Sequence, residues 1–532
     1  METMTVRVPA SADQERRSHW AVWLIAAAAY AVELAVSGRY GYDCDELYFL
    51  VAGQHLAAGY VDQPALTPLL ARLFSLATGD TLVGLRALTA LGLPLMVLLT
   101  ASMARMLGAS RAGQVIAALA TACCAEYLGA FHLLTTTPVD FVGWTVLLWL
   151  VVRLLTSGDV RWWLPAGLVA GVALSAKWNI GFLIAGLAIG LLVTLRASRA
   201  LGSSRALLPL PFHLACLRRT PRPSGPSPAR PIARSYARWR SLRLAAPIIA
   251  VTAAVVLASP DVAWQETHGW ANLGVFASLQ QAAWHNRAVY WPSQALYTSV
   301  ALVPLWIRGL LRLLREPRLR AVGVAAAFVI AAQFVLGGKP YYPGGVYPVL
   351  FAAGAIGVER IAARAAAYCS AGAASILIAL PVLPATTLAH VPLQDINNDL
   401  GEQIAWPREV ALVARVYAAL PPSGRSVTAV LAGNYAEAGA VDQYGPSLGL
   451  PSAYSGHNAF WWWGPPPARD TAVVAIGVDP SILRAQFTSV RLVATYDNGL
   501  GISAPEQGVQ VYIATGRRTS WAAAWPAFRH YG

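Results

Sequence analysis

The stretch LVGLRALTALGLPLMVLLTASMARML, residues 82–107, carries only two charged residues, Arg86 and Arg105. A helix needs about 20 predominantly apolar residues to cross about 30 Å of membrane hydrocarbon. This stretch therefore predicts a membrane-spanning helix. It also places one arginine about one turn inside the outer end of that helix.

Apolar runs of the same kind recur from about residue 20 to about residue 390. The chain is 56% hydrophobic and 12% charged, with a mean hydropathy of +0.49, whereas a soluble globular protein has about twice that charged fraction. A single signal peptide does not explain so many runs. We predict eleven spans, at about residues 20–38, 82–107, 112–131, 139–156, 162–176, 179–195, 244–260, 295–311, 321–336, 345–358 and 366–389.

The basic residues predict the orientation of these spans. Residues 196–243 contain eleven arginines and no acidic residue, which marks a flexible cytoplasmic loop by the positive-inside rule. The tail 1–19 falls on the same side, and the acidic loops fall on the other. The net charge of +14 therefore reflects membrane topology, and we expect a multi-pass protein of the cell membrane with no nucleic-acid partner.

The segment 391–532 differs from the membrane domain, 20–390. Short strand patterns at 427–431, 471–476, 491–495 and 509–514 alternate with helical patterns at 403–419 and 480–487, which predicts a small α/β domain. An odd number of spans places this domain outside the cell. The predicted fold class is thus a polytopic α-helical membrane protein with a C-terminal extracytoplasmic α/β domain. The five cysteines show no CxxC spacing, and no zinc or disulfide framework is visible.

The first outer loop, residues 39–81, is the richest candidate site. Its start, Tyr40–Tyr48, contains three carboxylates, Asp43, Asp45 and Glu46. We predict an amphipathic helix along the membrane surface from Glu46 to about Ala58. A carboxylate at such a boundary is partly desolvated and becomes a better proton acceptor. The alternative is a solvated acidic loop that merely obeys topology.

Three cations are candidates for binding a phosphate. Arg86 lies inside an apolar run, where a guanidinium is costly and is a functional hypothesis by default; the alternative is an arginine that snorkels to the interface. Lys177 and Lys339 are the only lysines of the chain. Both map to outer helix ends, against the positive-inside trend, although chance placement of two residues is the alternative.

A metal site is a weaker candidate. His268, with Glu266 and Asp62, could hold a divalent ion, but one histidine with scattered carboxylates is a weak pattern. The tryptophans of this loop and those at 461–463 could stack on sugar rings or form an interfacial belt.

An ordered set of motifs resembles one family of membrane enzymes over nearly the whole chain. The set resembles the protein O-mannosyltransferase and aminoarabinose-transferase group, glycosyltransferase family 39, which has a GT-C fold. Its members here are Asp45-Glu46-Leu47-Tyr48, Gly59–Pro64, Lys177-Trp178, Trp264-Gln265, Gly338-Lys339-Pro340-Tyr341-Tyr342, Asn434–Gly439 and Ser455–Asn458.

The resemblance implies an inverting transferase that takes its sugar from a polyprenyl-phosphate donor in the lipid bilayer. It assigns Asp45 as the general base, with Glu46 beside it as a structural or substrate contact, and Arg86 as a contact of the donor phosphate. Asp62 is the nearest match to an acidic residue that helps to bind metal in the aminoarabinose branch, whereas its pairing with His268 rests on the residues alone. Gln63 stands where a lysine follows in the family, and Ala65 stands where many members have a second proline. Further substrate contacts are expected at Tyr48, Asp62, Gln63, Tyr341, Tyr342 and His268.

Two other functions fit a polytopic protein. A transporter or flippase of lipid-linked sugars would place charges or helix breaks at mid-membrane in matched halves. A scaffold protein would leave the acidic loop and Arg86 unexplained. The sugar remains open among mannose, arabinose and other pentoses or hexoses. The acceptor remains open among a protein, a glycan and a lipid.

Overall fold

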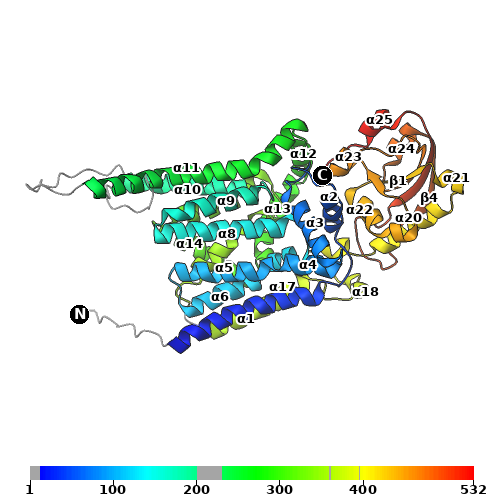
Figure 1. The fold of residues 1–532 in the computed structure, drawn as a ribbon. Coiled ribbons are helices and arrows are strands. Elements are labelled where there is room, and N and C mark those ends of the chain that lie inside the picture. The colour runs from blue at the N-terminus through cyan, green and yellow to red at the C-terminus, as the bar shows by residue number, and fades with distance from the viewer. Residues whose placement is uncertain (1–11, 201–229, 359–360, 395) are drawn as a thin grey trace, which may run out of the picture.

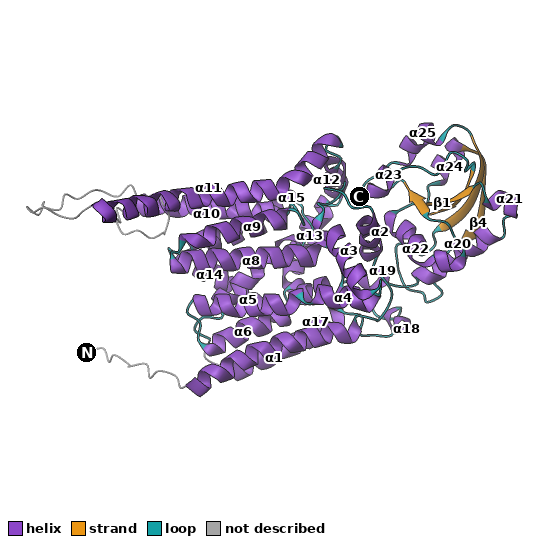
Figure 2. Ribbon diagram, in the orientation of Figure 1, coloured by secondary structure: helices purple, strands orange, loops and turns teal. Residues whose placement is uncertain are grey.

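The computed structural model describes residues 12–200, 230–358, 361–394 and 396–532. Long helices lie side by side in one part, and a smaller part with a β-sheet lies at one end of them (Figures 1 and 2). The middle of the predicted loop 196–243 lies outside the described residues. Its two ends are helical, because α10 runs to Ala200 and α11 begins at Arg230.

Among the helices of the larger part, the most extensive contacts are between α10 and α15 and between α9 and α11. In chain order they are α1 (Ala12–Val36), α2 (Cys44–Gln54), α3 (Leu66–Thr78), α4 (Leu82–Ala90), α5 (Gly92–Met106), α6 (Arg111–Ala122), α7 (Ala125–His132), α8 (Thr136–Ser157), α9 (Trp163–Leu174), α10 (Ile180–Ala200), α11 (Arg230–Thr267), α12 (Asn272–Gln281), α13 (Ala283–Tyr297), α14 (Val303–Arg315), α15 (Arg320–Leu336), α16 (Tyr347–Gly354), α17 (Ile361–Ala379), α18 (Ala385–Leu388) and α19 (Asp399–Glu402).

Several of these helices can cross a membrane, which agrees with the predicted polytopic fold. Among the described residues, four helices are long and apolar enough, and the bent pairs α6–α7 and α13–α14 raise this number to six. Shorter apolar helices coincide with the remaining predicted spans, except for the eight-residue helix α16. The count of eleven spans stays a prediction.

Two predicted loops are helical in the structure. Helix α11 continues through Pro260 to Thr267, so the segment around Trp264 is helix and the predicted end near residue 260 is wrong. A proline is tolerated in a spanning helix because neighbouring helices and local adjustments satisfy the freed backbone groups. Helix α3 was not predicted at all, since its 13 residues are too few to read as a span.

Helix α2 replaces the predicted amphipathic helix from Glu46 to Ala58. It begins after Asp43, which caps the first turn in a capping box with Glu46, and it ends at His55. Its middle is buried rather than spread on a membrane surface, because α22 of the C-terminal domain packs on it. Gly439 of α22 approaches so closely that a Cβ there would lie 3.0 Å from the Leu47 side chain.

The C-terminal part is the predicted α/β domain. Its strands are β1 (Thr428–Ala432), β2 (Ala453–Ser455), β3 (Ala472–Ile476), β4 (Phe487–Thr495) and β5 (Gln510–Arg517), and its helices are α20 (Trp406–Ala418), α21 (Pro422–Arg425), α22 (Tyr435–Tyr444), α23 (Asn458–Trp462), α24 (Pro480–Gln486) and α25 (Trp521–Ala524). The sheet order is β2-β1-β3-β5-β4, parallel among the first three strands and antiparallel at β5 and β4. Buried side chains of α2 and of this domain belong to one continuous apolar core.

Three buried carboxyl groups make the stability of this domain depend on pH. Burial raises the pKa of Glu437 to about 8 and that of Glu506 to about 7, and it raises the pKa of Glu409 well above its usual value. The folded state therefore binds more protons than the unfolded state between about pH 4.5 and pH 8. These three groups therefore stabilise the folded domain fully below about pH 4.5, and their contribution is lost as the pH rises to about 8.

We expect the amides of β1 and β3 to exchange hydrogen about tenfold or more faster at pH 8 than at pH 5, after correction for intrinsic rates, since tenfold corresponds to about 1.4 kcal/mol. Glu409→Gln removes one of the buried charges and should reduce this difference. Glu266→Gln, at an exposed position, is the matched control. If the corrected exchange rates of the β1 and β3 amides in the wild-type protein do not change with pH, the expectation is contradicted.

Candidate active site

A cavity of about 910 Å³ lies where the helical part meets the C-terminal domain. Its polar end is formed by α2, α19, α22 and the loop that carries Lys339. Its other walls come from α7, α13 and α17. The lining includes Asp43, Cys44, Asp45, Glu126, Ala130, Leu133, Val289, Leu296, Tyr297, Lys339, Tyr341, Ile378, Asp399, Glu402, Tyr435, His457 and Glu506. One cavity thus combines a cluster of charged side chains with walls that are mainly apolar.

Asp45 lies at the charged end, in the first turn of α2. Its backbone N–H donates to the Asp43 carboxylate at 3.0 Å, which holds the start of the helix. Its own carboxylate accepts a hydrogen bond from the Tyr435 hydroxyl at 2.9 Å and is partly exposed to the cavity. A carboxylate in this position can accept a proton from a bound hydroxyl.

Tyr435 reaches Asp45 from the C-terminal domain, 390 positions further along the chain. Its ring stacks on His457 at 4.8 Å between centroids and lies 4.8 Å from the ring of Tyr48. His457 in turn stacks on His530. Burial and the neighbouring His530 lower the pKa of His457 to about 4, so that this ring is neutral at pH 7. The aromatic stack fixes the direction of the tyrosine hydroxyl.

Tyr435→Phe should therefore weaken the positioning of Asp45 without removing the carboxylate. We expect kcat to fall by about tenfold, since a hydrogen bond to a charged group contributes about 1.5–3 kcal/mol. KM should change little, because the Tyr435 hydroxyl acts through Asp45. A raised KM with an unaltered kcat would contradict a positioning role. Tyr454→Phe, in the same domain but outside the cavity lining, is the control.

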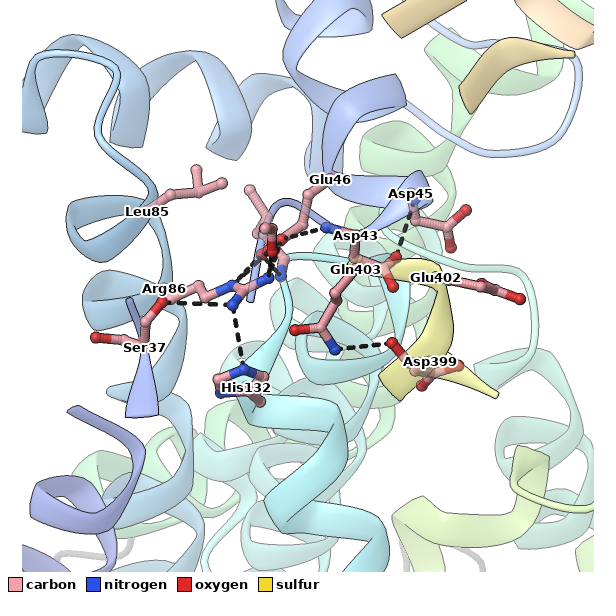
Figure 3. Close-up of polar contacts among 12 residues, drawn as sticks. Ser37, Asp43, Asp45, Glu46, Leu85, Arg86, His132, Asp399, Glu402 and Gln403 are labelled. Atoms are coloured by element: carbon pink, nitrogen blue, oxygen red, sulfur yellow. Dashed lines mark hydrogen bonds and ion pairs between the residues drawn. The ribbon is translucent and has the colours of Figure 1, made fainter. Parts of the chain in front are cut away.

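Arg86 and Glu46 form a buried ion pair behind the cavity (Figure 3). Arg86 is 1% exposed and Glu46 is 0% exposed, with Nη2 2.7 Å from Oε2. The guanidinium also donates to the backbone carbonyl groups of Ser37, Arg39 and Gly41. The predicted contact of Arg86 with a donor phosphate is not available in this arrangement, because its donors are occupied and its side chain does not line the cavity. Glu46 is likewise structural, and it also accepts the backbone N–H of Leu134.

The two lysines lie near each other at Tyr341, as the sequence suggested for a cationic site. Lys339 lines the cavity, and its Nζ lies 5.9 Å from the centre of the Tyr341 ring. Lys177 lies behind the lining, with Nζ 5.3 Å from the Tyr341 ring and 4.9 Å from the Tyr342 ring. Burial lowers the pKa of Lys177 to about 8, and Lys339 acts in the same direction while Asp140 opposes it. Phosphate binding by this pair stays a prediction.

The predicted contacts in the Asp62 region lie outside the cavity lining. The Asp62 carboxylate accepts hydrogen bonds from the Tyr48 hydroxyl at 2.8 Å and from the Asn458 amide at 3.2 Å. Burial raises the pKa of Asp62 to about 6. Gln63 is buried beside it. In this arrangement Asp62 joins α2 to the C-terminal domain.

His268 packs against Trp264, and its role as a metal ligand with Asp62 stays a prediction. Its Nδ1 lies 2.8 Å from the carbonyl oxygen of Trp264, and its ring stacks on the Trp264 ring. Among the described residues, the one group of three His, Cys, Asp or Glu side chains with convergent ligand atoms is Asp43, Cys44 and Glu402. The predicted pair therefore lacks a third ligand of that kind, and metal dependence stays a prediction.

Several residues of the cavity were not predicted from the sequence. Asp399 and Glu402 come from a short helix before the α/β domain, and Figure 3 shows both near Asp43 and Asp45. Glu126 follows the break between α6 and α7, and its Oε1 is buried without a hydrogen-bond partner. A capping box from Asn434 to Glu437 was the one local signal for the start of α22, which carries Tyr435.

Comparisons with known proteins agree with the predicted fold. A family model described as dolichyl-phosphate-mannose-protein mannosyltransferase matches residues 62–217. ArnT from Cupriavidus metallidurans in the apo state is similar over 94% of this chain and 98% of its own, with 12% identity and a TM-score of 0.55. The undecaprenyl phosphate-bound structure of ArnT matches over 93% and 98%, with 14% identity and a TM-score of 0.49. No curated protein sequence matches the chain.

The match to apo ArnT spans nearly the full length of both chains. It confirms the predicted GT-C fold class, including the sheet domain after the helices. At 12% identity the likeness establishes the fold, and the activity has to be argued from the cavity.

Proposed function

We propose that the protein is an inverting glycosyltransferase that moves a sugar from a polyprenyl-phosphate donor to an acceptor hydroxyl at the extracytoplasmic membrane face. The shape and chemistry of the cavity carry this proposal. A carboxylate, Asp45, and a cation, Lys339, line its polar end, while α7, α13 and α17 contribute mainly apolar side chains, with Glu126 and His285 as ionisable exceptions. A donor with a charged phosphate and a long hydrocarbon chain needs both environments in one site.

The proposed reaction is a single displacement. Asp45 accepts the proton of the acceptor hydroxyl as its oxygen attacks the anomeric carbon. The bond from that carbon to the phosphate oxygen breaks, and its electron pair leaves with the polyprenyl phosphate. Lys339, with Lys177 behind it, stabilises the negative charge that remains on the phosphate. One displacement at carbon inverts the anomeric configuration.

The matched family model supports the donor class, because its description names a dolichyl-phosphate sugar. The fold shared with ArnT is compatible with the same chemistry. The arrangement of charges also favours an enzyme over a flippase. Asp45, Glu402 and Lys339 line the cavity beside the C-terminal domain rather than in matched halves at mid-membrane.

The test is transfer by the purified full-length protein from a panel of polyprenyl-phosphate sugars to peptide, glycan and lipid acceptors. We expect one donor to be used and its product to have the inverted anomeric configuration. If the protein moves intact lipid-linked sugar across the membrane of vesicles and transfers none of it to an acceptor, the flippase hypothesis replaces this proposal.

A further inference from the structure

Three ligand-type side chains converge at the polar end of the cavity. Asp43, Cys44 and Glu402 each offer one ligand atom, and these atoms all lie within 4.8 Å of one another. The Cys44 thiol donates to Glu402 Oε2 at 3.1 Å and lies 3.6 Å from Asp43 Oδ1. All three residues line the cavity.

A second observation distinguishes this group from an ordinary acidic cluster. The Asp43 side chain is 3% exposed, and its Oδ2 has no hydrogen-bond partner. Although Oδ1 accepts the backbone N–H of Asp45, a buried carboxylate oxygen without a partner is costly. Glu46, three residues later and equally buried, is fully paired with Arg86. The chain thus neutralises one of two buried carboxylates and leaves the other facing Cys44 and Glu402.

The charge balance of the cavity points in the same direction. Asp43, Asp45, Asp399 and Glu402 all line its polar end. Lys339 is the one lysine or arginine among the described residues that line the cavity, and its Nζ faces the ring of Tyr341. With Glu126 and Glu506, six carboxyl groups line the cavity against this one lysine, so a bound cation would reduce the repulsion among the acidic side chains.

We propose that Asp43, Cys44 and Glu402 bind a divalent ion of the zinc type. A thiolate selects zinc or cobalt over magnesium and calcium, which prefer oxygen ligands alone. Three protein ligands leave one position of a tetrahedral ion free for water or a substrate oxygen. Binding releases the thiol proton to solvent. The site differs from the pair Asp62 and His268, and although it lies in the proposed transferase cavity, it requires no transfer activity.

Cobalt(II) gives a direct readout, because a thiolate bound to it produces a charge-transfer absorption band in the near ultraviolet. Metal-stripped full-length protein should show this band on titration with Co²⁺, saturating at one equivalent, and Zn²⁺ should abolish it. Cys44→Ser should lose the band. Cys369→Ser, at an exposed cysteine, should keep it.

A second variant tests the carboxylate without touching the thiol. Glu402→Gln should weaken Co²⁺ binding by about tenfold or more while the circular dichroism spectrum is kept, since a ligand matters at least as much as an outer-shell partner. No band in the wild-type protein, a band that survives in Cys44→Ser, or unchanged affinity in Glu402→Gln would each overturn the proposal. Metal binding without sugar transfer would leave this site intact and reject the proposed function instead.

Discussion

Asp45→Asn is expected to lower the rate of sugar transfer by about 10²–10⁴-fold, the usual contribution of a general base. Asparagine keeps the size of the side chain and can still accept the hydrogen bond from Tyr435, which is 2.9 Å long in the wild-type protein. It cannot take a proton at neutral pH. The measurement is the single-turnover rate with the donor identified from the panel.

Asp80→Asn is the matched control for Asp45→Asn. Asp80 lies in the same outer loop, is exposed and does not line the cavity. Its backbone has a φ of +58°, a conformation that asparagine also tolerates. Full activity of Asp45→Asn would exclude Asp45 as the base. A matching loss in Asp80→Asn would indicate a general disturbance of the loop.

Arg86→Gln should produce the largest loss of stability among single substitutions near the cavity. It leaves Glu46 as an unpaired buried charge, and breaking a buried pair in this way costs about 3–5 kcal/mol. The double variant Glu46→Gln/Arg86→Gln removes both charges and should recover part of the loss. Unfolding in detergent, followed by tryptophan fluorescence, compares the three proteins.

The chain contains a natural control for the Arg86 pair. Arg161 and Asp159 form an ion pair of similar length, 2.8 Å, but the arginine side chain is 87% exposed. Arg161→Gln should leave the free energy of unfolding nearly unchanged, because an exposed ion pair contributes little to stability. If Arg86→Gln is as stable as the wild type and instead raises the KM for the donor, the phosphate-binding role predicted from sequence is correct after all.

The fold was largely predictable because its signals are local. The spans predicted from apolar length match α8, α10 and α15 closely, and the short strand patterns located β1 and β3. Errors arose where a local signal was ambiguous. Pro260 looked like the end of a helix, yet α11 passes through it. The bend of 54° between α6 and α7 lies inside the single predicted span 112–131, and α13 lies almost wholly before the predicted span 295–311.

The site was only half predictable, since contacts between distant segments leave little trace in one sequence. Asp45, Glu46 and Arg86 stood out individually, but nothing in the sequence alone paired Arg86 with Glu46. For that reason Arg86 was predicted to bind the donor phosphate, whereas in the structure its guanidinium pairs with the Glu46 carboxylate. Tyr435 and Glu402 come from segments hundreds of residues away from Asp45, and no local pattern assigns them to it.

The contacts between α2 and the C-terminal domain imply an order of events during synthesis. Asp45 is made 390 positions before Tyr435, and Asp62 is made 396 positions before Asn458. At about 5–20 residues per second, translation separates such partners by about 20–80 s. During that interval Arg86 and Glu46 can already pair, whereas Asp45 and Asp62 wait without their later partners. A chimaera that exchanges the C-terminal domain between related proteins should therefore exchange residues 40–64 together with it.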